Sequence, residues 1–552
     1  MSMRRLMLIA VVPFILSEEP RRSTWIQRSD VNTQLLQQAL TRWHPETFDS
    51  VEPADSIYRP EEDVRHEHEV RRIRDHFRLR LVGEPDPNVR QDLETLVVAA
   101  DRHLNLNTYW RTKGGMLLSP ASIVEAGLSR ALLQSASDTY SVAMARLERY
   151  SGRAKGYKPL AATAERLARS GVAVADTPRP SRKAVLRLLD SEAAALARLK
   201  SRLTRRIPAA GRESFAVLCA QLDRYREFLR RDLLPLCGDD EPEDYKWALM
   251  TQGVDADPIV LRREARLEYE ETLLEMHTLG EEIAREAKWT NPAPAAVLQQ
   301  LCAESVPVSD LVEHYRRRLR DVEGIIERER LVTLSVRNVL MEVGGTRPGY
   351  VPPPLLAHDG QLGTVVIPNS IPEAACRAVS WTVVAHEIRP GHEMQYAAAL
   401  ERGISKARAL FGWSTVGVEG WAMYAESLVE PYMPKEGRLA ALQFRCLRYA
   451  RAFLEPGMAN GSLSEDDARL LLTEELGLSA AMAAQEVDRL SRLTGEPAAY
   501  FYGFRELHRI RQETEARARR RFNRRVYHDF ILQQGFVPLA VLRAAVARRF
   551  GE

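Results

Sequence analysis

The chain has 552 residues, of which 45% are hydrophobic and 28% charged, so it can bury a sizeable core and is not intrinsically disordered. Its 78 Lys and Arg residues against 75 Asp and Glu residues leave a net charge of +3. This near balance argues against nucleic-acid binding as the main task, because a phosphate-binding surface usually carries a larger basic excess.

The first residues look like the start of a signal peptide, because Arg4 and Arg5 precede an apolar run from Leu6 to Leu16. No small-x-small cleavage site and no lipobox cysteine follow this run. Its eleven residues are also too few to span a bilayer, which needs about 20. We therefore expect no stable membrane span and a cytoplasmic location, with export by an atypical signal as the alternative. Residues 1–55 are interpreted as an N-terminal segment, either signal-like or the product of a start codon assigned too early.

Helical periodicity begins near Val89 and continues almost to the C-terminus. Within residues 91–111, apolar side chains recur three and four positions apart, which is typical of an amphipathic helix. The same pattern predicts helices over residues 122–150, 181–205, 213–234, 259–287 and 308–341. Strand-like alternation is scarce. The sequence therefore predicts a mainly α fold, a large helical bundle in which residues 56–552 form a single domain.

The five cysteines are scattered, at Cys219, Cys237, Cys302, Cys376 and Cys446. None forms a CxxC pair, and an odd, sparse set argues against a disulfide framework and against zinc bound by cysteine. We therefore expect any metal to be bound by His and carboxylate side chains.

One irregular segment interrupts the helices between Gly344 and Pro368. Gly and Pro occur here at a density that excludes helix over residues 344–360. Residues 362–368, Leu-Gly-Thr-Val-Val-Ile-Pro, are the best strand candidate in the chain. We expect this segment to form the edge of a channel that pairs with an extended peptide backbone, the alternative being that it only caps the helices.

The most informative stretch contains His386 and Glu387, followed by a second histidine, His392. In the zincin motif H-E-x-x-H, two imidazoles lie one helical turn apart and the Glu is the general base. Here the two histidines are six residues apart, so they would lie about 240° apart on a regular helix. Pro390 and Gly391 can turn the backbone between them and bring the second histidine back. The alternative is an ordinary polar helix end with a histidine in the following turn.

Two carboxylates lie in an otherwise apolar, aromatic stretch further along the chain. Glu419 and Glu426 are seven residues apart, about two helical turns, so they share one face of a helix. Buried carboxylates are costly unless they are paired or bind a metal. One of them can bind the metal while the other accepts a proton from a histidine ring. The alternative for Glu419 is an ordinary Arg partner.

These motifs occur in a fixed order with two later ones. The order is His386-Glu387-x-x-Pro390-Gly391-His392-x-x-Gln395, then Glu419-Gly420-Trp421-Ala422-Met423-Tyr424, then Tyr500-Phe501-Tyr502-Gly503, then Tyr527-His528-Asp529-Phe530 and on to Leu539. In order and spacing they resemble the DUF885 family of bacterial proteins, which is similar to helical gluzincin metallopeptidases. The resemblance covers roughly residues 60 to 550. It implies an all-helical fold with a deep central channel.

The resemblance also implies a zinc site within residues 344–552. Carried over to the matching positions, it makes His386, His392 and Glu419 the zinc ligands and Glu387 the general base. A zinc with three protein ligands keeps a position for water and lowers the pKa of that water. The expected function is therefore a zinc-dependent hydrolase of peptide or amide bonds, acting on a peptide or a small amide-containing substrate and not on nucleic acid.

The oxyanion of such a reaction needs hydrogen-bond donors besides the metal. Tyr500 and Tyr502, in what we expect to be a Gly-containing aromatic turn, are candidates, as is His528. The alternative is that all three are ordinary core residues.

One position departs from the family pattern. The family commonly reads P-G-H-H, and the second of these histidines is Glu393 here. Glu393 either binds the metal itself or faces solvent, and Arg389 either positions an acidic group of a substrate or pairs with Glu393 at the surface. The departure leaves two other functions open, a catalytically silent binding protein of the same fold and a metal hydrolase of a small acylated metabolite. A homodimer is also left open.

Overall fold

The structure is a computed structural model that describes residues 24–43, 60–112, 117–133, 139–170, 179–180, 182–204, 206–238, 245–345, 349–353, 355–356, 362–369, 372–492 and 494–551. The signal-like residues at the N-terminus lie outside the described residues. Helices dominate the rest, which confirms the predicted mainly α class. Among the described residues, no helix is both long and apolar enough to cross a bilayer.

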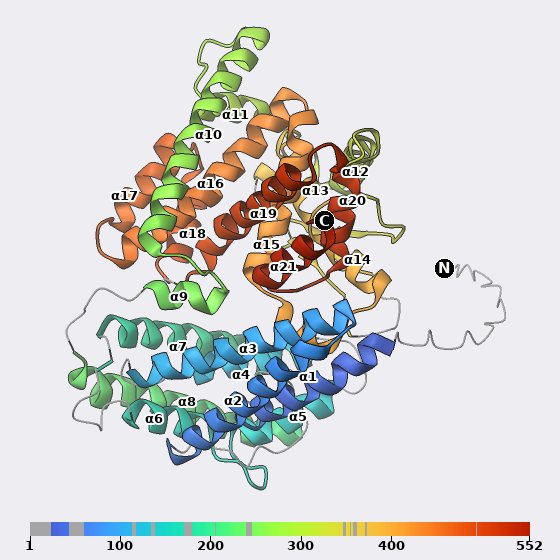
Figure 1. Ribbon diagram of the computed structural model, residues 1–552. Helices are drawn as coiled ribbons and strands as arrows, with labels where there is room; N and C mark the ends of the chain where they lie inside the picture. Colours follow the sequence, from blue (N-terminus) through green and yellow to red (C-terminus); the bar gives the residue numbers. More distant parts are fainter. Residues whose placement is uncertain are drawn as a thin grey trace, which may run out of the picture.

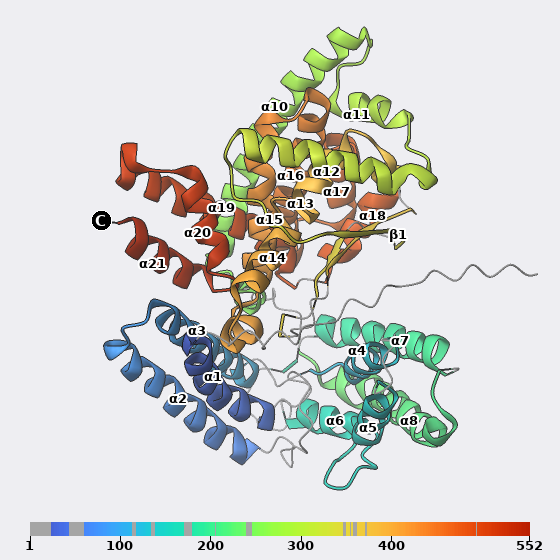
Figure 2. The ribbon, with the colours of Figure 1, turned by 90° about the vertical axis from the view of Figure 1, so that its right-hand side faces the viewer.

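The N-terminal part of the chain builds two helical groups, each with its own apolar core. Leu36, Phe77 and Leu93 meet in the first core, whereas Leu196 and Leu222 belong to the second. Figure 2 shows the two groups next to each other beneath the C-terminal helices. The helices are α1 (Thr24–Trp43), α2 (Pro60–Gly83) and α3 (Pro87–Thr112) in the first group, and α4 (Pro120–Leu133), α5 (Thr139–Tyr150), α6 (Leu160–Ser170), α7 (Arg182–Leu203) and α8 (Arg212–Phe228) in the second.

The C-terminal part contains the largest core and forms the upper half of the molecule in Figure 1. Its long central helix α16 packs along α10, and α15 packs against α19. The helices are α9 (Tyr245–Gln252), α10 (Pro258–Ala287), α11 (Pro294–Ala303), α12 (Leu311–Arg328), α13 (Val379–Glu387), α14 (His392–Arg402), α15 (Thr415–Val429), α16 (Lys435–Ala459), α17 (Glu465–Leu470), α18 (Ala480–Leu490), α19 (Glu496–Ala518), α20 (Arg524–Gln533) and α21 (Leu539–Phe550).

A three-stranded sheet lies in the irregular segment between α12 and α13. Its central strand β3 (Thr364–Ile367) confirms the strand predicted in residues 362–368. It pairs in parallel with β1 (Leu340–Val343) and antiparallel with β2 (Gly349–Val351), so both of these are edge strands. Residues 346–348, 354 and 357–361 of the predicted irregular segment lie outside the described residues.

The helix predicted over residues 308–341 ends earlier, at Arg328, and its last residues form β1 instead. The backbone of the intervening segment is held by α20, because Thr333 donates from its N–H and its hydroxyl to the Asp529 carboxylate at 2.8 and 2.7 Å. These tertiary bonds are not visible in a local pattern, and the apolar residues of the segment fit either structure. The stretch predicted over 122–150 is likewise two helices, α4 and α5.

Two of the five cysteines form a disulfide, Cys302–Cys376, which the argument from their spacing did not foresee. The two residues are 74 positions apart in the chain, and neighbouring Ser305 and Cys376 form an isolated antiparallel bridge that aligns the end of α11 with the segment before α13. Cys219, Cys237 and Cys446 take no part in a disulfide among the described residues.

A fully buried ion pair joins the first helical group to the C-terminal part. The Arg408 guanidinium donates to Asp92 of α3 at 2.6 Å and to the Gln534 carbonyl at 2.7 Å. Both side chains are at most 2% exposed. Removal of either partner would leave an uncompensated buried charge, so this pair fixes how the two parts meet.

Stability should depend on pH through Glu455, a completely buried carboxyl of α16. It accepts hydrogen bonds from the Tyr245 hydroxyl and from the Gly495 N–H. Burial raises the pKa of Glu455 from 4.5 to about 7, although these hydrogen bonds oppose the shift. The folded protein therefore keeps a proton that the unfolded chain releases, and this stability is lost as the pH rises from 4.5 through 7, by about 3 kcal/mol in total.

We expect Glu455→Gln, which mimics the protonated form, to remove this contribution to the pH dependence. Between pH 5 and pH 8, the free energy of unfolding in urea should fall less for the variant than for the wild type. Glu436→Gln, at an exposed position of the same helix, is the control and should follow the wild type. Equal pH dependence of all three proteins would contradict the assignment.

Candidate metal centre

The two histidines of the motif lie at the end of one helix and the beginning of the next. Helix α13 ends at Glu387, the chain passes through a cis Arg389–Pro390 peptide, and α14 begins at His392. Gly391 is required in this turn, because a Cβ there would collide with the carbonyl oxygens of Ala385 and His386. As a result, the imidazoles of His386 and His392 lie 4.7 Å apart between ring centroids.

Helix α15 brings Glu419 to these two rings. The helix begins directly after Ser414, whose hydroxyl accepts a hydrogen bond from the Gly417 N–H as its N-cap. One oxygen of Glu419, Oε2, lies 3.3 Å from His386 Nε2 and 3.5 Å from His392 Nε2. The three predicted ligands therefore converge, with their ligand atoms all within 4.8 Å of one another.

These residues fit a zinc ion. Zinc bound tetrahedrally at about 2.0–2.1 Å holds neighbouring ligand atoms about 3.4 Å apart, which matches both distances from Glu419. Glu419 Oε2 is buried and has no hydrogen-bond partner within the described part of the chain. Burial would raise the pKa of Glu419, but the two imidazoles outweigh it and hold that pKa well below its usual value. A buried anionic oxygen between two imidazoles is the donor set that a divalent cation of this type requires.

The second carboxylate of α15, Glu426, contacts the ring nitrogen of His386 that is farther from Glu419. His386 Nδ1 lies 2.6 Å from Glu426 Oε1, which leaves Nε2 to face Glu419. Thr382 and Arg448 also donate to the Glu426 carboxylate. Burial and Arg448 would lower the pKa of His386, but Glu426 and Glu419 outweigh them and raise it to about 9.

We expect Glu426→Gln to weaken zinc binding by about 10- to 100-fold without removing a ligand, because carboxylates behind metal-bound histidines contribute affinity of this size. Competition with a chelator would measure the change. Glu430→Gln is the control and should bind zinc like the wild type. Glu430 lies four residues after Glu426 and is also a buried carboxylate paired with arginines, namely Arg438 and Arg445. Equal affinity of the Glu426 and Glu430 variants would contradict the role of Glu426.

A cavity of about 330 Å³ opens onto the three ligands. Glu387, the predicted general base, lines it next to them and is 8% exposed. Tyr500 also lines the cavity, and burial raises the pKa of its hydroxyl, so the hydroxyl stays protonated. Apolar side chains, among them Val383 and Leu447, also line the cavity.

The structure does not bring Tyr502 and His528 to this cavity. The predicted aromatic turn is part of helix α19, where Tyr500 and Tyr502 point to different faces because two residues correspond to about 200°. The Tyr502 hydroxyl donates to the Asp255 carbonyl at 3.4 Å. His528 is fully buried, with its two nitrogens 2.8 Å from the Tyr424 hydroxyl and 2.7 Å from the Leu331 carbonyl.

Glu393, the departure from the family pattern, neither joins the three converging ligands nor faces solvent. It is 3% exposed and accepts from Arg389 Nε at 3.0 Å. Arg389 is itself buried and also donates to Glu323 and to the Arg337 carbonyl. The pair expected at the surface is therefore a buried ion pair, and Arg389 does not line the cavity described above.

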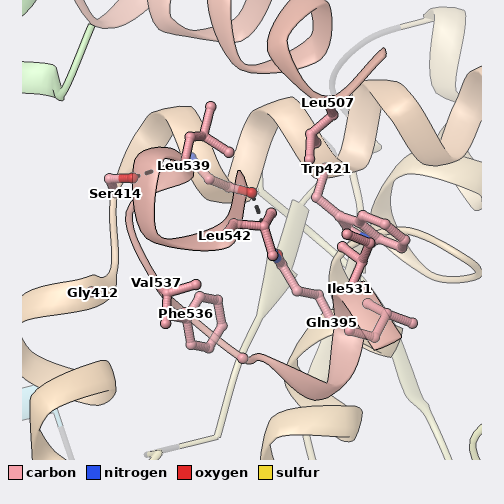
Figure 3. Close-up of a pocket in the computed structure, with 13 residues that line it drawn as sticks. Gln395, Gly412, Ser414, Trp421, Leu507, Ile531, Phe536, Val537, Leu539 and Leu542 are labelled. Atoms are coloured by element: carbon pink, nitrogen blue, oxygen red, sulfur yellow. Dashed lines mark hydrogen bonds between the residues drawn. The ribbon is translucent and has the colours of Figure 1, made fainter. Parts of the chain in front are cut away.

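Two further motif positions set the spacing of the helices. Gly420 and Gly503 pack against each other so closely that a Cβ on either would collide with backbone, which lets α15 and α19 approach and brings Tyr500 near Glu419. Gln395 lines a separate cavity of about 20 Å³ (Figure 3) and donates to the Gly417 carbonyl at 3.2 Å. This bond ties α14 to the first turn of α15.

Three arginines that the motif analysis did not select also line the cavity, Arg448, Arg451 and Arg489. For Arg448 and Arg451 the available signal was the same as for Glu419, namely charged residues in a largely buried helix. Arg448 and Arg451 lie one turn apart in α16, where the surrounding residues 446–459 are all buried.

Comparisons with known proteins agree on the fold and leave the chemistry open. A family model described as "Bacterial protein of unknown function (DUF885)" matches residues 56–546. Among solved structures, the chain is similar to a "putative lipoprotein of unknown function" from Shewanella oneidensis, with a TM-score of 0.73, 16% identity, and coverage of 95% of this chain and 99% of the other. A "putative lipoprotein" from Colwellia psychrerythraea has a TM-score of 0.70 at 16% identity, with coverage of 96% and 99%. A search of curated proteins finds no match.

Proposed function

The chain belongs to the DUF885 family of bacterial proteins of unknown function, and from the geometry of its candidate metal centre we propose that it is a zinc-dependent hydrolase of peptide or amide bonds. One observation carries the proposal. Two imidazole nitrogens converge on a carboxylate oxygen at 3.3 and 3.5 Å beside a cavity, and a second carboxylate, that of Glu387, lines the same cavity.

His386, His392 and Glu419 would hold the metal. Zinc bound by three protein ligands lowers the pKa of water and polarises a carbonyl group. Three ligands with a cavity beside them suit a catalytic role better than a purely structural one, since structural zinc sites close with four protein ligands.

Glu387 is the proposed general base. It follows a ligand directly in the chain, and it lines the cavity where a substrate carbonyl would be bound. Its carboxylate accepts the proton of the attacking water and passes it to the departing amine. The Tyr500 hydroxyl, kept protonated by burial, donates to the oxyanion that develops on the carbonyl.

A peptide substrate is supported by the edge strand β2. Its residues Gly349 and Tyr350 line the cavity, and within the described residues its other edge is not paired with a strand. An extended peptide can add to such an edge through backbone hydrogen bonds. A small acylated metabolite remains the second candidate, since a cavity of about 330 Å³ accommodates little more than one or two side chains.

Glu393, the feature that favoured a catalytically silent binding protein, no longer supports that hypothesis. Glu393 replaces a family histidine, but it neutralises Arg389 within the protein and leaves His392 and Glu419 free to bind metal.

For the location, we infer export instead of the cytoplasm expected from the sequence. The Cys302–Cys376 disulfide supports an oxidising compartment, and each of the two similar structures is described as a "putative lipoprotein".

Zinc content and its removal test the proposal. We expect about one zinc per purified chain, hydrolysis of members of a mixed peptide library, loss of that activity after dialysis against a chelator, and recovery on adding zinc. If the protein binds no zinc even after reconstitution, the proposal is wrong and a binding scaffold is the better account.

A further inference from the structure

The cavity beside the metal ligands carries an unusual pair of arginines. Arg451 of α16 and Arg489 of α18 both line it. Arg451 is 8% exposed, and the side chain of Arg489 is 17% exposed. Buried guanidinium groups are costly unless they are paired, so their partners and their remaining donors identify what they can bind.

Each arginine uses the same edge to bind a glutamate. Arg451 donates from Nε and Nη2 to Glu486 at 2.8 and 2.9 Å. Arg489 donates from Nε and Nη2 to Glu496 at 3.1 and 2.6 Å. A guanidinium has five N–H donors, so each Nη1 group remains, and neither is engaged by another described residue of the protein.

Tyr500 fixes the orientation of both groups. The guanidinium carbons of Arg451 and Arg489 each lie 5.2 Å from the centroid of its ring. Arg489 Nη2 also donates to the Tyr500 hydroxyl at 3.1 Å. Two guanidinium groups held by glutamates and stacked on one ring are pre-organised, so little further ordering is needed to bind an anion.

This arrangement lines the same cavity as the three proposed metal ligands. Arg448, one turn before Arg451 on α16, also lines this cavity and lies 3.3 Å through Nη2 from His386 Nδ1. A substrate bound at the three ligands therefore shares its cavity with both arginines.

We propose that Arg451 and Arg489 form a subsite for a carboxylate close to the bond that is cut, which makes the substrates anionic peptides. The carboxylate is either the free C-terminus or an Asp or Glu side chain. This inference rests on the proposed function for the identity of the cleaved bond. Each glutamate binds only the Nε and Nη2 edge of its arginine, so the Nη1 donors can still bind an anion. These Nη1 donors form charge-assisted hydrogen bonds with the substrate carboxylate.

Binding without turnover tests the subsite separately from the hydrolysis. Zinc-loaded Glu387→Gln protein would be titrated by calorimetry with three probes: N-acetyl-Phe-Ala, its C-terminal amide, and N-acetyl-Phe-Asp amide. We expect at least one of the two probes that have a carboxylate to bind at least about tenfold more tightly than N-acetyl-Phe-Ala amide, because hydrogen bonds to charged groups contribute this much. A preference for N-acetyl-Phe-Ala indicates the C-terminus, and a preference for N-acetyl-Phe-Asp amide indicates a side-chain carboxylate.

Charge-neutral double variants keep the test independent of misfolding. Arg451→Gln/Glu486→Gln and Arg489→Gln/Glu496→Gln remove both members of a pair, so neither arginine is removed while its glutamate stays charged. With zinc content unchanged, each should bring the affinity ratio of the preferred carboxylate probe to the amide towards one. Arg266→Gln/Glu270→Gln is the matched control, since Arg266 also pairs with a glutamate and stacks on aromatic rings, but outside the cavity. It should keep the full ratio.

Equal binding of all three probes, or a preference for a carboxylate that survives in both double variants, would overturn the subsite. So would undetectable binding of both carboxylate probes at millimolar concentration. Hydrolysis of peptides by the wild type without preference for a carboxylate would leave the proposed function standing and remove this inference. Discrimination in binding with no hydrolysis of any peptide would contradict the proposed function alone.

Discussion

Glu387→Gln should keep zinc and lose turnover by about 10²- to 10⁴-fold, the range that general acid–base catalysis contributes. Gln has almost the same size and can still line the cavity, but its amide cannot accept the proton of the attacking water. His386, His392 and Glu419 are unchanged, so the zinc content by elemental analysis should equal that of the wild type. The measurement is kcat on the best substrate from the peptide screen, at saturating zinc.

Glu373→Gln is a suitable control for this experiment. Glu373 lines the same cavity but does not lie beside a metal ligand in the chain or among the converging ligand atoms. We expect this variant to keep zinc and most of its turnover. A Glu387→Gln protein with full activity would show that another group takes the proton, and loss of zinc in that variant would make its lost activity uninformative about the base.

Local pattern was sufficient for helices such as α10 and for the turn between the two histidines. Residues 259–287 repeat apolar positions at helical spacing, and α10 spans Pro258–Ala287 with Asp257 as its N-cap. The six-residue spacing of His386 and His392 predicted a break at Pro390 and Gly391, and the chain does turn there. In both cases the information lies within a few neighbouring residues, where propensity and steric limits act directly.

Features that depend on tertiary contacts could not be predicted in the same way. The pairing of Cys302 with Cys376 requires two segments 74 residues apart to meet. The side chain of Tyr500 reaches the cavity and that of Tyr502 does not, because the close packing of Gly420 on Gly503 sets which face of α19 approaches α15.

The environment of Glu393 is a further case of the same kind. Its partner Arg389 is a local residue, and the pairing was one of two alternatives that the sequence left open, but the burial of the pair was not predicted. Arg389 is drawn inward by Glu323 of α12 and by the Arg337 carbonyl, neither of which is near in sequence. A charged residue next to a metal ligand therefore could not be assigned to the metal, to solvent or to the core from the motif alone.

Alanine variants at His392, Glu419 and Glu393 decide the ligand set. We expect about one zinc per chain in the wild type and almost none in His392→Ala and Glu419→Ala, because each variant removes one of only three protein ligands. Glu393→Ala should keep its zinc. It should instead lower the free energy of unfolding by about 3 kcal/mol, because breaking a buried pair leaves Arg389 with only part of its compensation.

The two readouts separate a metal ligand from a buried ion pair at neighbouring positions. Loss of zinc with nearly unchanged unfolding of the metal-free protein identifies a ligand, whereas retained zinc with lower stability identifies a residue of the core. If His392→Ala keeps zinc and Glu393→Ala loses it, the two roles are exchanged. The turn at Pro390 and Gly391 would then place a carboxylate, not an imidazole, at the metal. The short distance between His392 and Glu419 would need another explanation.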